Sequence, residues 1–252
     1  MKSIFIEGTA GSGKSLLTSK LSEYYTQNGA FPAILNLDPG VESLPYTCDI
    51  DVRDYVDIVS IMKQYDLGPN GALIMANDLI ASKIDDIQDQ IEKVNPDYLI
   101  IDTPGQIELF AYRSSGPFLV ENLTTDEKVN IFLYDGVLVN SPINFVSLAL
   151  LATSIKLRLN LPTINVLTKT DLIADRLKDI LKWSTNLSAL EGAIAQEVDG
   201  DTYSLTTNIL RGLNLSGFAQ GLIPISNVTG EGMVNLESAL SRTINLGEEV
   251  ED

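Results

Sequence analysis

The sequence contains no histidine, a single cysteine (Cys48) and a single tryptophan among its 252 residues. The absence of histidine excludes the commonest general base and one of the commonest metal ligands of proteins. Any acid–base chemistry must therefore use carboxylates, glutamine, water or the substrate itself. One cysteine also excludes a disulfide within the chain.

Basic residues are scarce as well: 17 Lys and Arg stand against 34 Asp and Glu, and the net charge is −17. Such a surface repels nucleic-acid phosphates and anionic lipids, so we expect no direct nucleic-acid partner and no membrane partner. No run approaches the roughly 20 apolar residues of a membrane helix. Glu7 interrupts the first apolar run, which argues against a signal peptide. We therefore expect a cytoplasmic protein with a frayed acidic tail at residues 247–252.

What the chain does contain is an alternation of apolar runs and helical patterns. Continuous apolar runs are typical of strands covered on both faces, and they occur at 2–7, 33–37, 98–101, 129–134, 163–167 and 222–225. Helical spacing is clearest at 13–28, 51–65, 77–93, 145–159 and 234–243. The alternation predicts an α/β fold, a doubly wound and mostly parallel sheet, in one domain over residues 1–252. Helical insertions are expected at about 38–94 and 174–221.

A phosphate-binding loop is indicated at residues 8–15 (GTAGSGKS), between a predicted strand and a predicted helix. The segment fits the pattern G-x-x-x-x-G-K-[ST], whose glycines let backbone N–H groups face phosphates at a helix N-terminus. The expected nucleotide contacts are Gly11, Ser12, Gly13, Lys14, Ser15 and Leu16. Lys14 is predicted to reach the β- and γ-phosphates and Ser15 to bind Mg²⁺. These residues predict a P-loop NTPase.

A second acidic site follows the apolar run at 98–101. Asp102 ends this predicted strand and precedes a tight turn through Gly105 and Gln106. The carboxyl end of such a strand lies beside the phosphate loop in a doubly wound sheet. Asp102 is therefore predicted to hold Mg²⁺ together with Ser15. Gln106 is predicted to orient the attacking water, as the corresponding glutamine does in other GTPases.

Recognition of the nucleotide base is predicted at Thr168-Lys169-Thr170-Asp171. This segment is similar to the guanine-specificity motif Asn/Thr-Lys-x-Asp. Asp171 can accept hydrogen bonds from N1–H and the exocyclic amine of guanine, whereas adenine would set a lone pair against it. The stem of Lys169 can lie along the base, and Ser226 is expected to close the pocket through its backbone. Thr168 stands where asparagine is commonest. The motif predicts GTP as substrate and GDP as product.

Gly68-Pro69-Asn70 resembles the signature of the GPN-loop GTPases, and four more segments agree with that family: 36–40 (NLDPG), 51–54 (DVRD), 102–108 (DTPGQIE) and 229–233 (TGEGM). The resemblance implies a homodimer of the dimerisation-dependent SIMIBI type, in which the Gly-Pro-Asn loop enters the partner's site. Asn70 would then contact the transferred phosphate in trans as a neutral donor. Asp38 would position water near the metal. Some relatives reach across the dimer with a lysine as second residue of the phosphate loop, but Thr9 stands there in this chain.

Three other functions stay open. A metal-insertion GTPase would need His and Cys ligands for its cargo, which this chain almost completely lacks. A P-loop ATPase or kinase would leave the motif ending at Asp171 without a purpose. A nucleotide-gated assembly factor with negligible turnover is compatible with GTP binding. Eukaryotic relatives are linked to assembly and nuclear import of RNA polymerase, but no residue here identifies a protein client.

Overall fold

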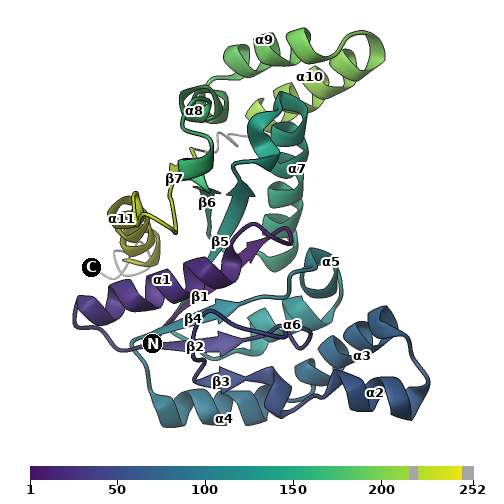
Figure 1. Ribbon diagram of the computed structural model, residues 1–252, viewed down its shortest axis with the longest axis vertical. Coiled ribbons are helices and arrows are strands. Elements are labelled where there is room, and N and C mark those ends of the chain that lie inside the picture. Colours follow the sequence, from purple (N-terminus) through teal and green to yellow (C-terminus); the bar gives the residue numbers. More distant parts are fainter. Residues whose placement is uncertain (216–220, 246–252) are drawn as a thin grey trace.

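A parallel sheet between two layers of helices forms the centre of the computed structural model, which describes residues 1–215 and 221–245 (Figure 1). Its strand order is β3-β2-β4-β1-β5-β6-β7, and each neighbouring pair is parallel. The strands are β1 Lys2–Gly8, β2 Pro32–Asn36, β3 Ile50–Asp51, β4 Tyr98–Asp102, β5 Glu127–Asp135, β6 Thr163–Thr168 and β7 Ile223–Pro224. The predicted α/β fold is confirmed. The acidic tail predicted at 247–252 lies outside the described residues.

Helices connect the strands and cover both faces of the sheet. They are α1 Lys14–Gln27, α2 Ile58–Tyr65, α3 Pro69–Ala81, α4 Ile84–Val94, α5 Ile107–Phe110, α6 Ser115–Asn122, α7 Pro142–Leu159, α8 Leu177–Thr185, α9 Leu187–Glu197, α10 Gly200–Leu215 and α11 Met233–Asn245. Successive side chains of β1 point to opposite faces. Ile4 and Ile6 belong to the core under α1 and α11, whereas the Phe5 ring lies 6.5 Å from that of Phe110 on the other face. Burial on both faces explains the continuous apolar runs.

The central strand, β1, defines where a ligand can bind. It pairs with β4 on one side and with β5 on the other. Later strands of the chain therefore lie on both sides of β1, and open parallel sheets bind ligands at the carboxyl ends of strands at such a switch point. Gly8 ends β1 there, and a Cβ atom on it would come within 2.9 Å of Leu133 Cβ. Only glycine fits this junction without displacing its neighbours.

The predicted helix at 51–65 is wrong in its first half. Residues Ile50–Asp51 form the edge strand β3, and a short 3₁₀ turn follows. The Asp51 carboxylate accepts the N–H of Arg53, and Asp57 accepts the N–H of Val59 at the start of α2. Aspartate is a strong N-cap, so each of these two carboxylates begins a new element.

The predicted single helix at 77–93 is also wrong, because α3 and α4 are separate helices. Ser82 and Lys83 lie between them, and their N–H groups bond to carbonyl oxygens three residues back, in a tighter turn than an α-helix. Buried apolar residues continue at helical spacing through this break: Ala76, Ile80, Ile84, Ile87 and Ile91. Hydrophobic periodicity therefore gave no sign of it.

Helix α7 is strongly apolar, although no long apolar run was expected in the chain. Its 18 residues have a mean hydropathy of 1.3, so by length and composition alone it could cross a membrane. It instead packs beside the sheet and against α9 and α10 (Figure 1). Phe145 on α7 makes an edge contact with the Trp183 ring of α8, at 6.1 Å between centroids. These contacts bury part of α7. Helices α8, α9 and α10 follow within the predicted insertion at 174–221, of which residues 216–220 lie outside the described part of the chain.

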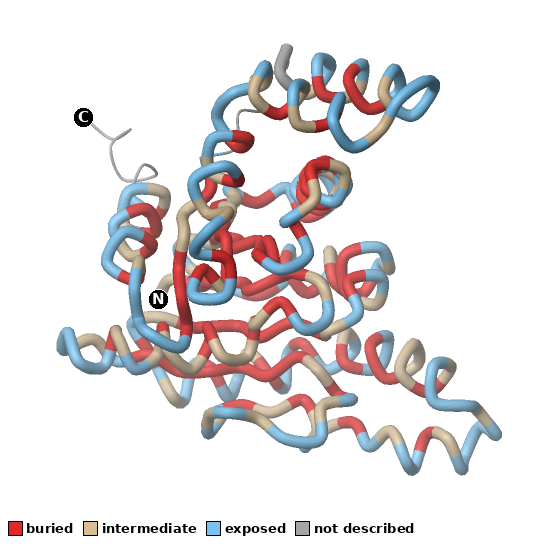
Figure 2. The backbone as a smooth tube through the Cα atoms, turned by 45° about the horizontal axis from the view of Figure 1, so that its top comes forward, coloured by how far each residue is buried: buried red, intermediate tan, exposed pale blue. Residues whose placement is uncertain are grey.

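Helices α2 and α3 form a hairpin that extends beyond the carboxyl ends of β2 and β3, on the same edge of the sheet as the phosphate loop (Figure 1). Gly68 caps α3, Pro69 is its first residue and Asn70 its second. Proline suits this position because its fixed φ matches the first helical turn and its missing N–H has no helical partner. All three residues are exposed, as is much of the hairpin's outer surface (Figure 2).

Candidate nucleotide site

The phosphate loop leaves β1 at Gly8 and enters α1 at Lys14. Gly11 has φ of +77° and Gly13 has φ of +96°, left-handed conformations that glycine adopts without strain. The first bond of the helix runs from Leu17 N–H to Gly13 O. The N–H groups of Lys14, Ser15 and Leu16 precede it, so they have no partner in the helix and can bind phosphate oxygens.

Lys14 lies folded against this loop. Its Nζ is 3.0 Å from Gly8 O and 3.2 Å from Thr9 O, and only 7% of the residue is exposed. Burial lowers the pKa of Lys14, while the charges of Asp102, Asp38 and Glu7 raise it. The ammonium group is thus held by two loop carbonyls, which phosphate oxygens can replace.

Glu7 lies directly before the phosphate loop and is 2% exposed. Burial raises its pKa to about 8, against the opposing effects of the Asn130 amide and the Lys14 charge. Asn130 Nδ2 is 3.5 Å from Glu7 Oε2. At neutral pH the protonated carboxyl group is therefore favoured. No motif marks Glu7; a lone carboxylate in an apolar strand was the available signal.

Asp102 is buried at the carboxyl end of β4, beside Ile6 of β1. Its Oδ2 accepts the Tyr46 hydroxyl at 2.7 Å, whereas Oδ1 is buried without a hydrogen-bond partner. Burial raises the pKa of Asp102, and the neighbouring Ser15, Tyr46 and Lys14 lower it. Burial also raises the pKa of Tyr46, so its hydroxyl stays protonated and donates.

These residues fit Mg²⁺. A buried carboxylate oxygen without a partner, next to the Ser15 hydroxyl, suits an ion that prefers oxygen ligands and keeps several waters. Within residues 1–215 and 221–245 no group of three His, Cys, Asp or Glu side chains is placed to hold a metal. Ser15 and Asp102 would therefore hold the ion jointly with phosphate oxygens of a nucleotide.

Asp38 joins the turn after β2 to the turn after β4. Its Oδ2 accepts the Gly105 N–H at 3.1 Å, and its Oδ1 accepts the Gly40 N–H at 2.9 Å. Gln106 follows Gly105, is exposed and caps α5. The structure thus brings Asp38 to the turn that carries Gln106, and their water-positioning roles stay a prediction.

The guanine motif lies after β6, at the same edge of the sheet. The Ser226 hydroxyl donates to Asp171 Oδ1 at 2.6 Å. The backbone N–H and C=O of Ser226 bond to Glu231 and Gly230 within their own turn, and the contact of Ser226 with the motif is made by its side chain. Lys169 Nζ lies 2.7 Å from Asp135 Oδ2, which holds the lysine side chain at the end of β5.

Two side chains tie these base-side loops to the phosphate loop. The buried Thr168 hydroxyl donates to Ser12 O at 2.8 Å. Asn227 Nδ2 donates to Gly13 O at 3.3 Å. Thr168 therefore has a structural task that explains a small hydroxyl side chain at this position, and the base side and the phosphate side are held in one frame.

The Gly-Pro-Asn residues do not join this frame. Asn70 is exposed at the start of α3, and none of the hydrogen bonds found in the described parts of the chain links it to the phosphate loop. The hairpin does contact the Asp38 turn: a Cβ atom on Gly40 would lie 2.8 Å from Leu73 Cδ2 of α3 and 3.4 Å from Asp38 Oδ1. The hairpin and the turn after β2 are thus in direct contact.

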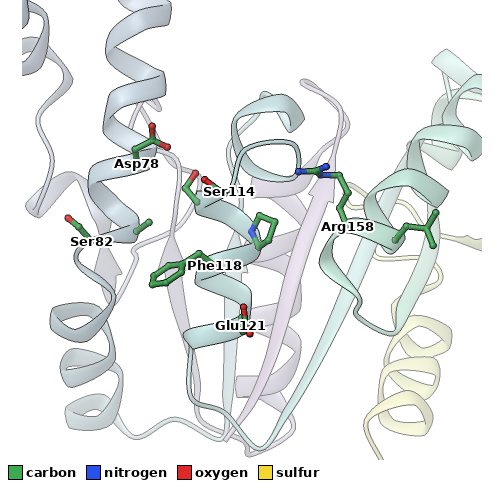
Figure 3. Close-up of a pocket in the computed structure, with 10 residues that line it drawn as sticks. Asp78, Ser82, Ser114, Phe118, Glu121 and Arg158 are labelled. Carbon is green, nitrogen blue, oxygen red and sulfur yellow. The ribbon is translucent and has the colours of Figure 1, made fainter.

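A separate cavity of about 840 Å³ lies between α3, α6 and α7 (Figure 3). Its lining includes Asp78, Ser82, Ser114, Phe118, Glu121 and Arg158. Arg113 pairs with Asp78 at 2.8 Å, and Arg158 donates to Tyr112 O at 3.0 Å. The first contact connects α3 to the turn between α5 and α6, and the second connects α7 to the same turn. None of the predicted nucleotide ligands lines this cavity.

Comparison with known proteins agrees with the geometry. The family described as "Conserved hypothetical ATP binding protein" matches residues 6–246. GPN-loop GTPase QQT2 of Arabidopsis thaliana is 35% identical over 233 residues, which cover 90% of this chain and 60% of the relative. GPN-loop GTPase 1 of Schizosaccharomyces pombe is 32% identical over 257 residues, covering 98% and 70%. The crystal structure of a GTPase from Pyrococcus abyssi, in its apo form, is 28% identical with a TM-score of 0.84, covering 96% of this chain and 97% of that one.

The parallel sheet and the phosphate loop at its switch point define a P-loop NTPase. Within that class, the chain belongs to the GPN-loop GTPase family. It spans 60% of the length of its Arabidopsis relative.

Proposed function

We propose that this chain hydrolyses GTP with Mg²⁺ and acts as a dimeric nucleotide switch. The frame that joins the two halves of the site carries this proposal. Thr168 and Asn227 bond to the carbonyl oxygens of Ser12 and Gly13, so a guanine acceptor and a phosphate cradle are held at a fixed separation. A nucleotide with both a guanine and a chain of phosphates can bind to the guanine acceptor and to the phosphate cradle at once.

In this proposal Lys14 and the N–H groups that open α1 bind the phosphates, and Ser15 and Asp102 hold Mg²⁺. The ion supplies positive charge to the phosphate oxygens as the bond to the γ-phosphate breaks. Gln106 and Asp38 orient the water, and the Gly105 N–H, which donates to Asp38 Oδ2, holds the two turns together. With no histidine in the chain, the proton of the water goes to a carboxylate or to the phosphate itself.

The proposal is tested by hydrolysis of GTP and ATP side by side, with and without Mg²⁺. We expect a strong preference for GTP that requires Mg²⁺. Asp171→Asn should reduce the preference roughly 10- to 100-fold, because an amide cannot accept both guanine N–H groups as a carboxylate does. Asp175→Asn, an exposed change four residues further along, is the matched control. Equal use of ATP by the unchanged protein would refute the guanine assignment, and tight GTP binding without phosphate release would favour the non-hydrolysing assembly factor.

We further propose that the active form is a homodimer in which Asn70 completes the partner's site. The support is the placement of Asn70: it is exposed on a hairpin at the phosphate-loop edge yet is not bonded to the loop of its own chain. A neutral donor aimed at developing charge contributes roughly 10²-fold or more to turnover in comparable sites. The compartment we propose is the cytoplasm, with a protein client that the family resemblance alone links to RNA polymerase assembly.

Asn70→Ala is expected to slow turnover by roughly 10²-fold while GTP affinity changes little, and the control Asn208→Ala, exposed on α10, should behave as the unchanged protein. Mixing Asn70→Ala with Lys14→Ala subunits tests the trans arrangement. In a mixed dimer, the intact phosphate site of one subunit receives Asn70 from the other, so phosphate release should recover. If mixed dimers form, as judged by native mass spectrometry, and activity stays low, Asn70 does not act in trans.

A further inference from the structure

A tyrosine from the irregular segment between β2 and β3 reaches the proposed metal site. Tyr46 is half-buried, while Pro45 and Thr47 on either side of it are exposed. Its hydroxyl donates to Asp102 Oδ2 at 2.7 Å, across 56 positions of sequence. The aromatic side chain therefore points inward from a surface segment and ends on a carboxylate that is 2% exposed.

The contact makes the two oxygens of the Asp102 carboxylate different from each other. Oδ2 is taken by Tyr46, and Oδ1 is buried with no hydrogen-bond partner among the described residues. Rotation of a carboxylate about its last torsion is soft, so an isolated Asp102 would have no fixed orientation. A strong hydrogen bond to one oxygen restricts that rotation and leaves the other oxygen in a defined place.

The segment that carries Tyr46 is held on both sides. Ser19 of α1 donates to Pro45 O at 3.4 Å, next to the tyrosine. At the far end Asp49 binds Ile34 of β2 twice, through its own N–H at 3.0 Å and through its carboxylate at 2.8 Å. The tyrosine hydroxyl is therefore delivered to Asp102 by an anchored stretch of backbone.

We propose that Tyr46 is a positioning residue for Mg²⁺: its hydroxyl fixes the Asp102 carboxylate so that Oδ1 faces the ion. This inference rests on the proposed Mg²⁺–GTP function of the same site. Residues that orient a metal ligand through a hydrogen bond typically change metal affinity by roughly 10- to 100-fold when removed. The opposite relation, in which Tyr46 obstructs the metal position and must leave, predicts tighter Mg²⁺ binding once the hydroxyl is gone.

The test is a Mg²⁺ titration of the complex with a fluorescent, non-hydrolysable GTP analogue, for the full chain and for Tyr46→Phe. We expect Tyr46→Phe to raise the Mg²⁺ concentration at half-saturation roughly tenfold, with unchanged analogue affinity in EDTA and an unchanged thermal midpoint without Mg²⁺. The matched control is Tyr55→Phe, which removes a half-buried hydroxyl bonded to Asp86 O at 3.4 Å, away from the site.

The outcomes separate this inference from the function on which it rests. If the unchanged protein binds the analogue with a clear Mg²⁺ requirement and Tyr46→Phe has the same half-saturation point or a lower one, the positioning role is refuted and the GTPase proposal stands. If the unchanged protein shows no Mg²⁺ requirement, both fail together. A shift shared by Tyr55→Phe would reflect a general loss of packing and would equally refute a specific role for Tyr46.

Discussion

The Lys14→Ala variant is expected to lose GTP hydrolysis by roughly 10²- to 10⁴-fold and to bind GTP at least tenfold more weakly. A hydrogen bond from an ammonium group to a charged partner contributes roughly 1.5–3 kcal/mol to binding, and more where charge develops in the transition state. The charges of Asp102 and Asp38 act on Lys14 in the structure. Without the lysine, these carboxylates would face the phosphates uncompensated, so the loss exceeds that of a single contact.

Calorimetric titration with a non-hydrolysable GTP analogue and a phosphate-release assay give the two quantities. Lys20→Ala is the matched control, because Lys20 lies on the same helix and pairs with Glu23 at 2.8 Å on its exposed side. Both variants should unfold at about the temperature of the unchanged protein. Binding by Lys14→Ala within threefold of normal would mean that the phosphates do not reach the ammonium group.

The Glu7→Gln variant is expected to remove a large pH dependence of stability. The folded pKa of Glu7 is about 8, against a usual value of 4.5. A raised folded pKa means that the native state binds the proton more tightly than the unfolded state. The stabilisation that protonated Glu7 gives to the folded protein is therefore complete below pH 4.5. It is lost as the pH rises to about 8, which changes the free energy of unfolding by about 5 kcal/mol at the most. Glutamine mimics the neutral carboxyl group and has no proton to lose.

Urea unfolding of both proteins between pH 4.5 and pH 9 measures this effect. Other carboxylates titrate too, so the quantity of interest is the difference in free energy of unfolding between the two proteins. That difference should be small at pH 4.5 and should favour Glu7→Gln increasingly up to pH 8. Glu23→Gln, half-exposed on α1, is the control and should give a flat difference. A flat line for Glu7→Gln would mean that the carboxyl group is ionised when buried.

Most strands of the sheet and the phosphate loop could be predicted, because they are determined by residues that are close together in the sequence. The strands are continuous apolar runs, and the glycines and lysine of the phosphate loop have a fixed spacing that the required backbone shape imposes. Asp102 was predictable because a carboxylate ending such a strand must lie at the ligand edge of the sheet. Each of these conclusions depends on neighbours in sequence or on a topological rule.

The remainder depends on contacts between distant residues. Tyr46 lies in a stretch without periodicity, and its approach to Asp102 is decided by how that stretch is anchored to α1 and β2. The strand β3 has two residues, too few for a pattern. The raised pKa of Glu7 comes from its burial in the folded protein, which its neighbours in the sequence do not determine.

The ties of Thr168 and Asn227 to the phosphate loop have a consequence for how such a switch resets. These ties hold the guanine side and the loop around the first phosphates in one piece, whereas none of the hydrogen bonds found in the described parts of the chain links Asn70 of the hairpin to that loop. In the proposed switch, departure of the last phosphate would release the hairpin and leave the contacts of the guanine side and the first phosphates unchanged. We expect GDP to stay bound after the conformational change. The interval before the next cycle would then be set by the rate of nucleotide exchange and not by the rate of hydrolysis.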